Sequence, residues 1–119
     1  MKYIGIIGSR TRNSWEDYQC IKKKFTEIFI GGDIIVSGGC GTGGDNFAET
    51  IARNNDIRII IFKADWDKYG KEAGFIRNND IAKISDTIIA CVSENRKGGT
   101  EDTIRKFKDF HPEGKVYLV

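Results

Sequence analysis

Residues 33–53 read DIIVSGGCGTGGDNFAETIAR, and this stretch contains the unit from which the fold is predicted. The apolar run from Asp33 to Val36 predicts a buried β-strand, and five glycines follow within residues 38–44. A helical pattern then starts near Asp45 and places four apolar residues on one face: Phe47, Ala48, Ile51 and Ala52. The order is therefore strand, glycine-rich loop, helix.

The same alternation extends over the rest of the chain. Apolar runs predict four more strands: Tyr3 to Ile7, Ile57 to Phe62, Thr87 to Val92 and Lys115 to Val119. Most runs are continuous, which is typical of strands covered on both faces of a parallel sheet. Three more helices are expected. The first starts at Ser14, which approximates a capping box with Asp17. The second runs from about Lys71 to Ile84 and the third starts at Thr100, with these apolar residues on their buried faces: Ala73, Ile76, Ala82 and Ile84 in the second, and Ile104 and Phe107 in the third.

This pattern predicts an α/β fold with a five-stranded parallel sheet between two layers of helices. Right-handed crossovers place the first strand centrally and give the order 3-2-1-4-5 of a three-layer, Rossmann-like sheet. The chain of 119 residues fits one domain, so residues 1–119 are expected to form a single nucleotide-ligand-binding domain.

Charge and cysteine content narrow the functional classes. Lys and Arg number 19 and Asp and Glu 17, and the net charge of +2 does not by itself favour nucleic acid or a membrane as a partner. Three cysteines without a C-x-x-C pair indicate a reduced protein, and no apolar run approaches the roughly 18 residues of a membrane span. The sequence thus predicts a cytoplasmic protein.

The loops after strands 1, 2 and 4 are expected to converge at the carboxyl edge of the sheet, where ligands of such folds bind. Glycines let backbone N–H groups approach an anion, and the following helix adds positive charge from its N-terminus. The glycine-rich loop is therefore interpreted as a phosphate cradle, against the alternative of a flexible turn, with these ligand-binding residues: Ser37, Gly38, Gly39, Gly41, Gly43, Gly44 and Asp45.

Part of this loop also matches a dinucleotide fingerprint. Gly39, Gly41 and Gly44 fit G-x-G-x-x-G, and Asp65 follows about 20 residues later, as a ribose-binding acid does. However, the motif follows the second strand, and a domain of this size leaves no room for a separate substrate domain. An NAD oxidoreductase is therefore a minor alternative. The Lys and Ser/Thr of a P-loop are missing, which argues against kinase or NTPase chemistry.

A second glycine loop precedes the last predicted helix. Gly98, Gly99 and Thr100 are assigned to ligand binding, although Thr100 is equally suited to capping the helix. Glu101 and Asp102 fall in the first helical turn, where acids complement the helix dipole. Both residues are also the candidate catalytic acids of the chain.

Further candidates come from other segments. Gly8, Ser9 and Arg10 follow the first strand, and Arg77 with Asn78 suits a phosphate or a polar edge. Trp66 either stacks on a base or covers the core. His111 precedes Pro112 in a turn far from these loops, which argues against His-based catalysis, and the pattern shows no paired base that would make Cys40 a nucleophile. No metal-ligand cluster is visible, so no metal is expected.

Together these motifs resemble the YspA-type (cpYpsA-related) branch of the SLOG superfamily, in the same order over nearly the whole chain. The superfamily also contains LOG-type phosphoribohydrolases and the Rossmann domain of DNA-processing protein A. The resemblance implies a fold that binds nucleotides or their derivatives, and members are proposed as ligand sensors or as enzymes that cleave N-glycosidic bonds. Asp102 stands nearest the catalytic acid of the LOG signature, one methylene shorter than its Glu.

Three functions stay open on this basis. The chain is expected to bind a nucleotide or nucleotide-derived phosphate ligand, such as an ADP-ribose-like molecule, as a sensor or processing module. The alternatives are an N-glycosidic hydrolase or transferase acting on nucleoside monophosphates, and a protein that binds single-stranded DNA. A homodimer is a further open possibility.

Overall fold

The computed structural model describes residues 1–40 and 43–119. It contains a five-stranded, all-parallel sheet in the order β3-β2-β1-β4-β5, which confirms the predicted topology. The elements follow one another as β1 (Tyr3–Gly8), α1 (Trp15–Ile28), β2 (Ile34–Ser37), α2 (Gly44–Asn54), β3 (Ile59–Ile61), α3 (Trp66–Tyr69), the 3₁₀ helix η1 (Gly70–Glu72), α4 (Ala73–Ile84), β4 (Thr87–Cys91), α5 (Gly99–Phe110) and β5 (Lys115–Leu118).

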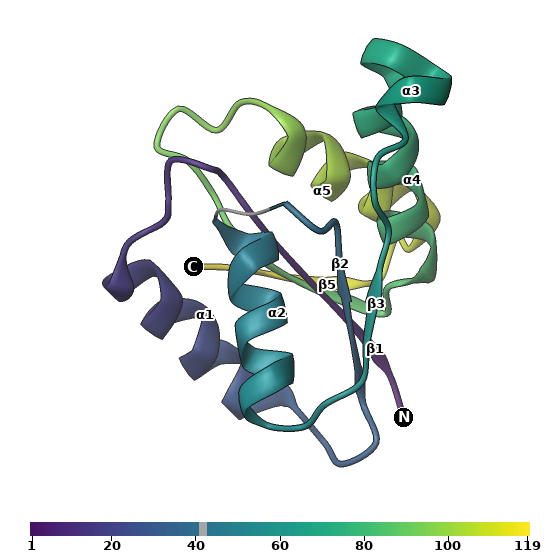
Figure 1. Ribbon diagram of the computed structural model, residues 1–119. Coiled ribbons are helices and arrows are strands. Elements are labelled where there is room, and N and C mark those ends of the chain that lie inside the picture. The colour runs from purple at the N-terminus through teal and green to yellow at the C-terminus, as the bar shows by residue number, and fades with distance from the viewer. Residues whose placement is uncertain (41–42) are drawn as a thin grey trace.

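Helices cover both faces of the sheet, as Figure 1 shows. Alternate residues of a strand point to opposite faces, so neighbouring residues of β4 enter two different cores. Ile89 packs with α1 and α2 residues such as Phe25 and Ile51, whereas Ile88 packs with α4 and α5 residues such as Ile81 and Phe107. The fold therefore has the predicted three layers.

The first helix begins as its sequence predicts. Ser14 Oγ accepts a hydrogen bond from Asp17 N at 3.1 Å, and Asp17 Oδ2 accepts one from Ser14 N at 3.2 Å, which completes the capping box. Asp17 also accepts from Arg12 Nε at 2.7 Å, and Arg12 Nη1 donates to Val92 O at 2.8 Å. This network ties the loop after β1 to the end of β4.

The segment after β3 differs from its prediction. The long helix begins at Ala73 and is preceded by α3 and η1, because Gly70 takes a positive φ of 58°. The predicted apolar stripe is correct for Ala73 and Ala82 but wrong for Ile76, which is 37% exposed. Asn78 and Ile81 are buried instead, because the amide of Asn78 finds hydrogen-bond partners on α5.

No helix among the described residues combines the length and the apolar character that crossing a membrane requires.

Candidate functional site

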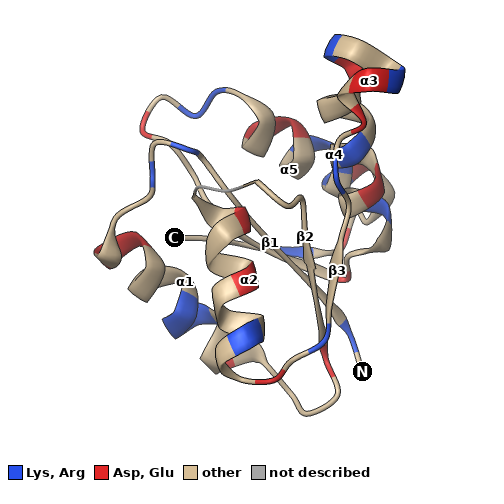
Figure 2. Cartoon of the chain, viewed as in Figure 1, with Lys and Arg blue, Asp and Glu red and all other residues tan. Residues whose placement is uncertain are grey.

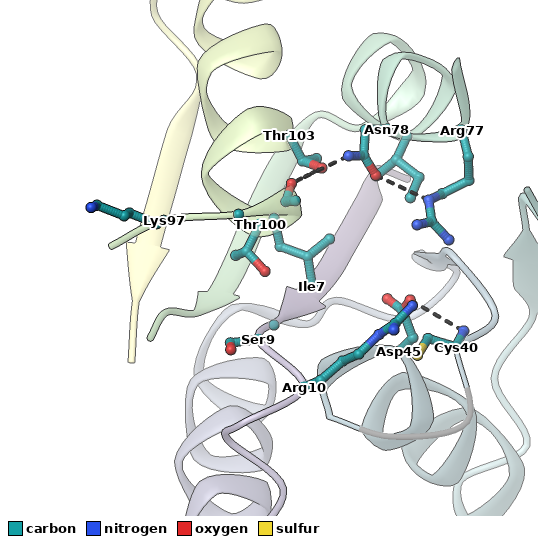
Figure 3. A pocket seen from close by; sticks show the side chains of 14 residues that line it. Ile7, Ser9, Arg10, Cys40, Asp45, Arg77, Asn78, Lys97, Thr100 and Thr103 are labelled. Carbon is teal, nitrogen blue, oxygen red and sulfur yellow. Dashed lines mark hydrogen bonds between the residues drawn. The ribbon is translucent and has the colours of Figure 1, made fainter. Parts of the chain in front are cut away.

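A cavity of about 310 Å³ opens at the carboxyl edge of the sheet. Four chain segments meet there: the end of β1, the β2–α2 loop with the first turn of α2, the middle of α4, and the start of α5 with the loop before it (Figure 3). Its lining consists of Ile7, Gly8, Ser9, Arg10, Cys40, Asp45, Arg77, Asn78, Ile81, Lys97, Gly98, Gly99, Thr100 and Thr103. The cavity therefore lies where the predicted ligand loops were expected to converge.

The glycines at the start of α2 are required by backbone packing. A Cβ on Gly44 would lie 2.4 Å from Gly8 N and from Ile7 C. Gly43 has a positive φ of 70°, and a Cβ there would lie 2.6 Å from Ser9 O. The first turn of α2 thus packs directly on the backbone after β1, and the Gly43 N–H donates to Asn13 Oδ1 at 2.8 Å. Neither Gly43 nor Gly44 lines the cavity.

Asp45 and Arg77 flank the backbone of Gly38. Arg77 Nη1 donates to Gly38 O at 3.0 Å, and a Cβ on Gly38 would lie 2.8 Å from both Arg77 Nη1 and Asp45 Oδ2. Asp45 Oδ2 accepts from Cys40 N at 3.2 Å. Burial raises the pKa of the Asp45 carboxyl, although the positive charge of Arg77 and the N–H groups of Cys40 and Gly38 act in the opposite direction.

The N-terminus of α5 forms another wall of the cavity. Its N-cap is Gly98, which has a φ of 106° and provides no side-chain hydrogen bond. Thr100 is therefore the second helical residue and not the cap, and it lines the cavity. N–H groups of the first helical turn have no partner within their own helix, so this end of α5 is suited to an anion.

Gly99 differs from the glycines of α2. A Cβ at Gly99 would meet only Asn78 Nδ2, at an ordinary contact distance of 3.6 Å, and its φ lies outside the left-handed region. The packing of the described residues therefore does not require glycine here. The absence of a side chain keeps open space beside the start of α5, as the approach of a ligand to backbone N–H groups requires.

Positive charge dominates the lining. Arg10, Arg77 and Lys97 are the basic residues of the lining, against the single carboxylate of Asp45. In Figure 3 the Arg10 side chain extends toward Asp45, whereas Lys97 points away from it. Arg10 has no hydrogen-bond or ion-pair partner within residues 1–40 and 43–119. This lining favours an anionic ligand.

The predicted ligand-binding residues separate into two groups. The lining includes Gly8, Ser9, Arg10, Asp45, Arg77, Asn78, Gly98, Gly99 and Thr100. Other predicted residues are described but lie outside it: Ser37, Gly38, Gly39, Gly43, Gly44 and Trp66. Trp66 lies on the projecting helix α3, is 54% exposed, and has its ring beside Gly74 at the start of α4. Gly41 lies outside the described residues.

The two candidate catalytic acids also lie outside the lining. Glu101 pairs with Arg96, with Arg96 Nη2 at 2.9 Å from Glu101 Oε1. Asp102 is buried at 5% exposure, with Arg105 bound to Oδ1 and with Oδ2 accepting from Asn78 Nδ2 at 3.2 Å. Lys106 Nζ is a further partner of Oδ2 at 2.9 Å. Asp102 therefore connects α4 to α5.

Asn78 is fully engaged in the same connection. Its amide nitrogen donates to Gly99 O at 3.3 Å and to Asp102, and its Oδ1 accepts from Arg77 Nε at 3.0 Å. Both amide hydrogens are thus used inside the protein. Asn78 shapes the cavity wall and positions Arg77.

Five residues of the lining were not predicted from the sequence to bind a ligand: Ile7, Cys40, Ile81, Lys97 and Thr103. Helical spacing carried the signal for two of them, because Ile81 follows Arg77 by one turn and Thr103 follows Gly99 by one turn. Among residues 1–40 and 43–119, no group of three or more His, Cys, Asp or Glu side chains is placed to hold a metal ion.

Comparison with known proteins adds no assignment to this geometry. No protein-family model, no curated protein and no solved structure matches the chain.

Proposed function

We propose that the chain binds a nucleotide or nucleotide-derived phosphate ligand in the cavity at the carboxyl edge of the sheet, as a sensor or processing module. The observation that carries this proposal is the open start of α5: a glycine N-cap without a side-chain hydrogen bond, beside Gly99, whose missing side chain nothing in the packing demands. Arg10 and Arg77 line the same cavity. Backbone N–H groups and guanidinium groups together suit a phosphate.

The volume of the cavity and its carboxylate, Asp45, also agree with a nucleotide. A volume of about 310 Å³ lies at the lower end of the range for small-molecule sites. Asp45 is an acceptor that suits a ribose hydroxyl beside the phosphate, because a carboxylate accepts hydrogen bonds from hydroxyl groups. The motifs that resemble the YspA-type branch of the SLOG superfamily support the same ligand class, and membership of that branch is part of the proposal.

A thermal-shift screen tests the proposal. The panel contains AMP, ADP-ribose, NAD, cyclic nucleotides and ribose 5-phosphate. A ligand at 100 times its Kd adds about 2.7 kcal/mol, which raises the melting temperature of a 119-residue domain by roughly 10 °C. A panel without any shift would contradict ligand binding.

Arg10 provides the matched variant for this screen. Arg10→Ala removes a cation without breaking an internal hydrogen bond, so the fold is retained and the ligand-induced shift decreases. Arg53→Ala is the control, because Arg53 is exposed in the last turn of α2, at the end of that helix away from the cavity. Equal shifts for both variants would remove Arg10 from the site.

The position of the acids favours binding over N-glycosidic cleavage. Asp102 lies outside the lining, and Asp45 is the carboxylate that reaches it. We expect no free base after incubation with nucleoside monophosphates. Base release that is lost in Asp45→Asn would establish the hydrolase alternative instead.

The distribution of charge also bears on the single-stranded DNA alternative. Basic and acidic residues both occur on the helices in Figure 2, so the positive charge of the cavity is local. A DNA-binding groove needs positive charge along the path of the backbone, and its affinity falls steeply with salt. We expect no salt-dependent binding of an oligonucleotide.

A further inference from the structure

A second hollow adjoins the cavity. It measures about 420 Å³ and is lined by Ser9, Thr11, Ser93, Glu94, Asn95 and Lys97. Ser9 and Lys97 line both spaces, and in Figure 3 they lie on the side of the cavity away from Arg77. A ligand whose phosphate occupies the cavity can therefore extend past these two residues into this space, called here the Ser93 hollow.

The loop from Ser93 to Lys97, which lines the Ser93 hollow, is held by hydrogen bonds within itself and by one contact to α5. Asn95 Oδ1 accepts from Ser93 Oγ at 2.8 Å and from Lys97 N at 3.2 Å. Arg96 has a positive φ of 55°, and its Nε donates to Glu101 Oε2 at 2.9 Å, which fixes the loop on α5. Because its wall is formed by internal bonds, the hollow needs little ordering when a ligand enters.

The chemistry changes between the two spaces. The cavity carries Arg10 and Arg77, Lys97 lines both spaces, and the charge found only in the Ser93 hollow is the carboxylate of Glu94. Glu94 is exposed and has no hydrogen-bond or ion-pair partner in the part of the chain that the structure describes. A free carboxylate repels a further anion and accepts hydrogen bonds from neutral hydroxyl groups.

Hydroxyl groups complete the lining. Ser9 Oγ and Thr11 Oγ1 lie 2.7 Å apart, and Ser93 contributes a third hydroxyl. No aromatic or aliphatic side chain lines the Ser93 hollow among the described residues, so it is poorly suited to a base. A group with several hydroxyls matches this set of donors and acceptors.

We propose that the Ser93 hollow is a sugar subsite and that the ligand class is a nucleoside diphosphate sugar. The diphosphate lies at the start of α5 with Arg10 and Arg77, and hydroxyls of the distal sugar donate to Glu94. This inference rests on the proposed function, since it extends the ligand from the same cavity.

Isothermal titration of matched ligand pairs tests the subsite. The pairs are ADP with ADP-ribose and UDP with UDP-glucose, so the members of each pair differ by the distal sugar. The wild-type chain is expected to bind the sugar-bearing member of at least one pair about tenfold more tightly, the size of a hydrogen bond to a charged group. Glu94→Gln reduces this advantage, because an amide oxygen accepts a weaker hydrogen bond than a carboxylate, and it leaves the Kd of the plain diphosphate within about twofold.

The control variant is Glu113→Gln, which makes the same chemical change in the turn before β5, at the opposite edge of the sheet. It is expected to leave all affinities unchanged. Equal affinities within both pairs, or a Glu94→Gln variant that weakens both members of a pair alike, would overturn the sugar subsite while the proposed function stands. Failure of all four ligands to bind would overturn the sugar subsite, and the proposed function falls with it only if the thermal-shift panel also shows no ligand.

Discussion

Replacing Asp102 by Asn tests whether this carboxylate stabilises the fold or acts on a ligand. Its Oδ2 accepts from Asn78 at 3.2 Å and lies 2.9 Å from Lys106 Nζ, and its Oδ1 binds Arg105. Asn has one acceptor oxygen where Asp has two, so one of the donors around residue 102 would face the new NH₂ group instead of an acceptor. The connection between α4 and α5 is then weakened.

The magnitude follows from the exposure of the partners. The Arg105 side chain is 69% exposed, so its pair contributes only about 0–1 kcal/mol. The bonds at the buried Oδ2 involve a charged group and contribute about 1.5–3 kcal/mol. We expect Asp102→Asn to lose about 1.5–4 kcal/mol of unfolding free energy. In a chain of 119 residues this lowers the melting temperature by roughly 6–15 °C.

Thermal unfolding followed by circular dichroism measures this loss. Asp109→Asn makes the same change in the last turns of α5, at an exposed residue, and is expected to melt close to the wild type. Below its melting temperature, Asp102→Asn should still bind nucleotide. An Asp102→Asn variant of unchanged stability that has lost ligand binding or a base-releasing activity would refute the structural role.

The remaining predictions concern other parts of the molecule. Gly44→Ala should lower the unfolding free energy by about 1–3 kcal/mol in urea titrations, because a Cβ there meets backbone atoms at 2.4 Å. Gly31→Ala is the control and should change the unfolding free energy little, because a Cβ there meets nothing within 4 Å. For Asp33, burial raises the pKa, but hydrogen bonds from Lys2 Nζ and N and from Ile30 N outweigh it and lower the pKa overall. The contribution of Asp33 to stability is therefore present above its unfolded pKa and is lost as pH falls through the lower folded pKa. In urea titrations, the difference in unfolding free energy between wild type and Asp33→Asn should vanish at acid pH. A difference that does not depend on pH would contradict this. Burial raises the pKa of the Cys91 thiol to about 11, so in a Cys20→Ser, Cys40→Ser variant a thiol reagent at pH 8 should label Cys91 only after unfolding, and rapid labelling of the folded chain would contradict its burial.

The sequence predicted the topology because hydrophobic periodicity is a local signal. The continuous Ile and Val runs and the Ser14 capping box needed no tertiary information, and strand order followed from the handedness of crossovers. Hydrophobic periodicity did not predict which face of α4 is buried, since Ile76 is exposed and Asn78 is buried. Asn78 is polar, and it is buried only because α5 supplies two acceptors from residues 21 and 24 positions away.

The sequence predicted the position of the candidate site but not the role of each residue in it. Composition located the converging loops, and Arg10, Arg77 and Gly99, which were predicted to bind a ligand, line the cavity. Composition does not tell which glycines serve packing, since Gly44 is required by contacts with Gly8, a residue far away in sequence. The acids of α5 also depend on tertiary context, because Asp102 and Glu101 turn to basic partners on α5 and on the preceding loop.

The measurement that tests the central claim most directly is the affinity of Gly99→Ala for ADP-ribose and AMP, by isothermal titration. Alanine adds a methyl group whose only contact within 4 Å is Asn78 Nδ2, at 3.6 Å, and alanine favours the helix more than glycine does, so the fold should be retained. The methyl group occupies the open space beside the first N–H groups of α5. We predict at least a tenfold rise in Kd, with Gly31→Ala unchanged. A folded Gly99→Ala variant that binds as tightly as the wild type would contradict a phosphate site at the start of α5.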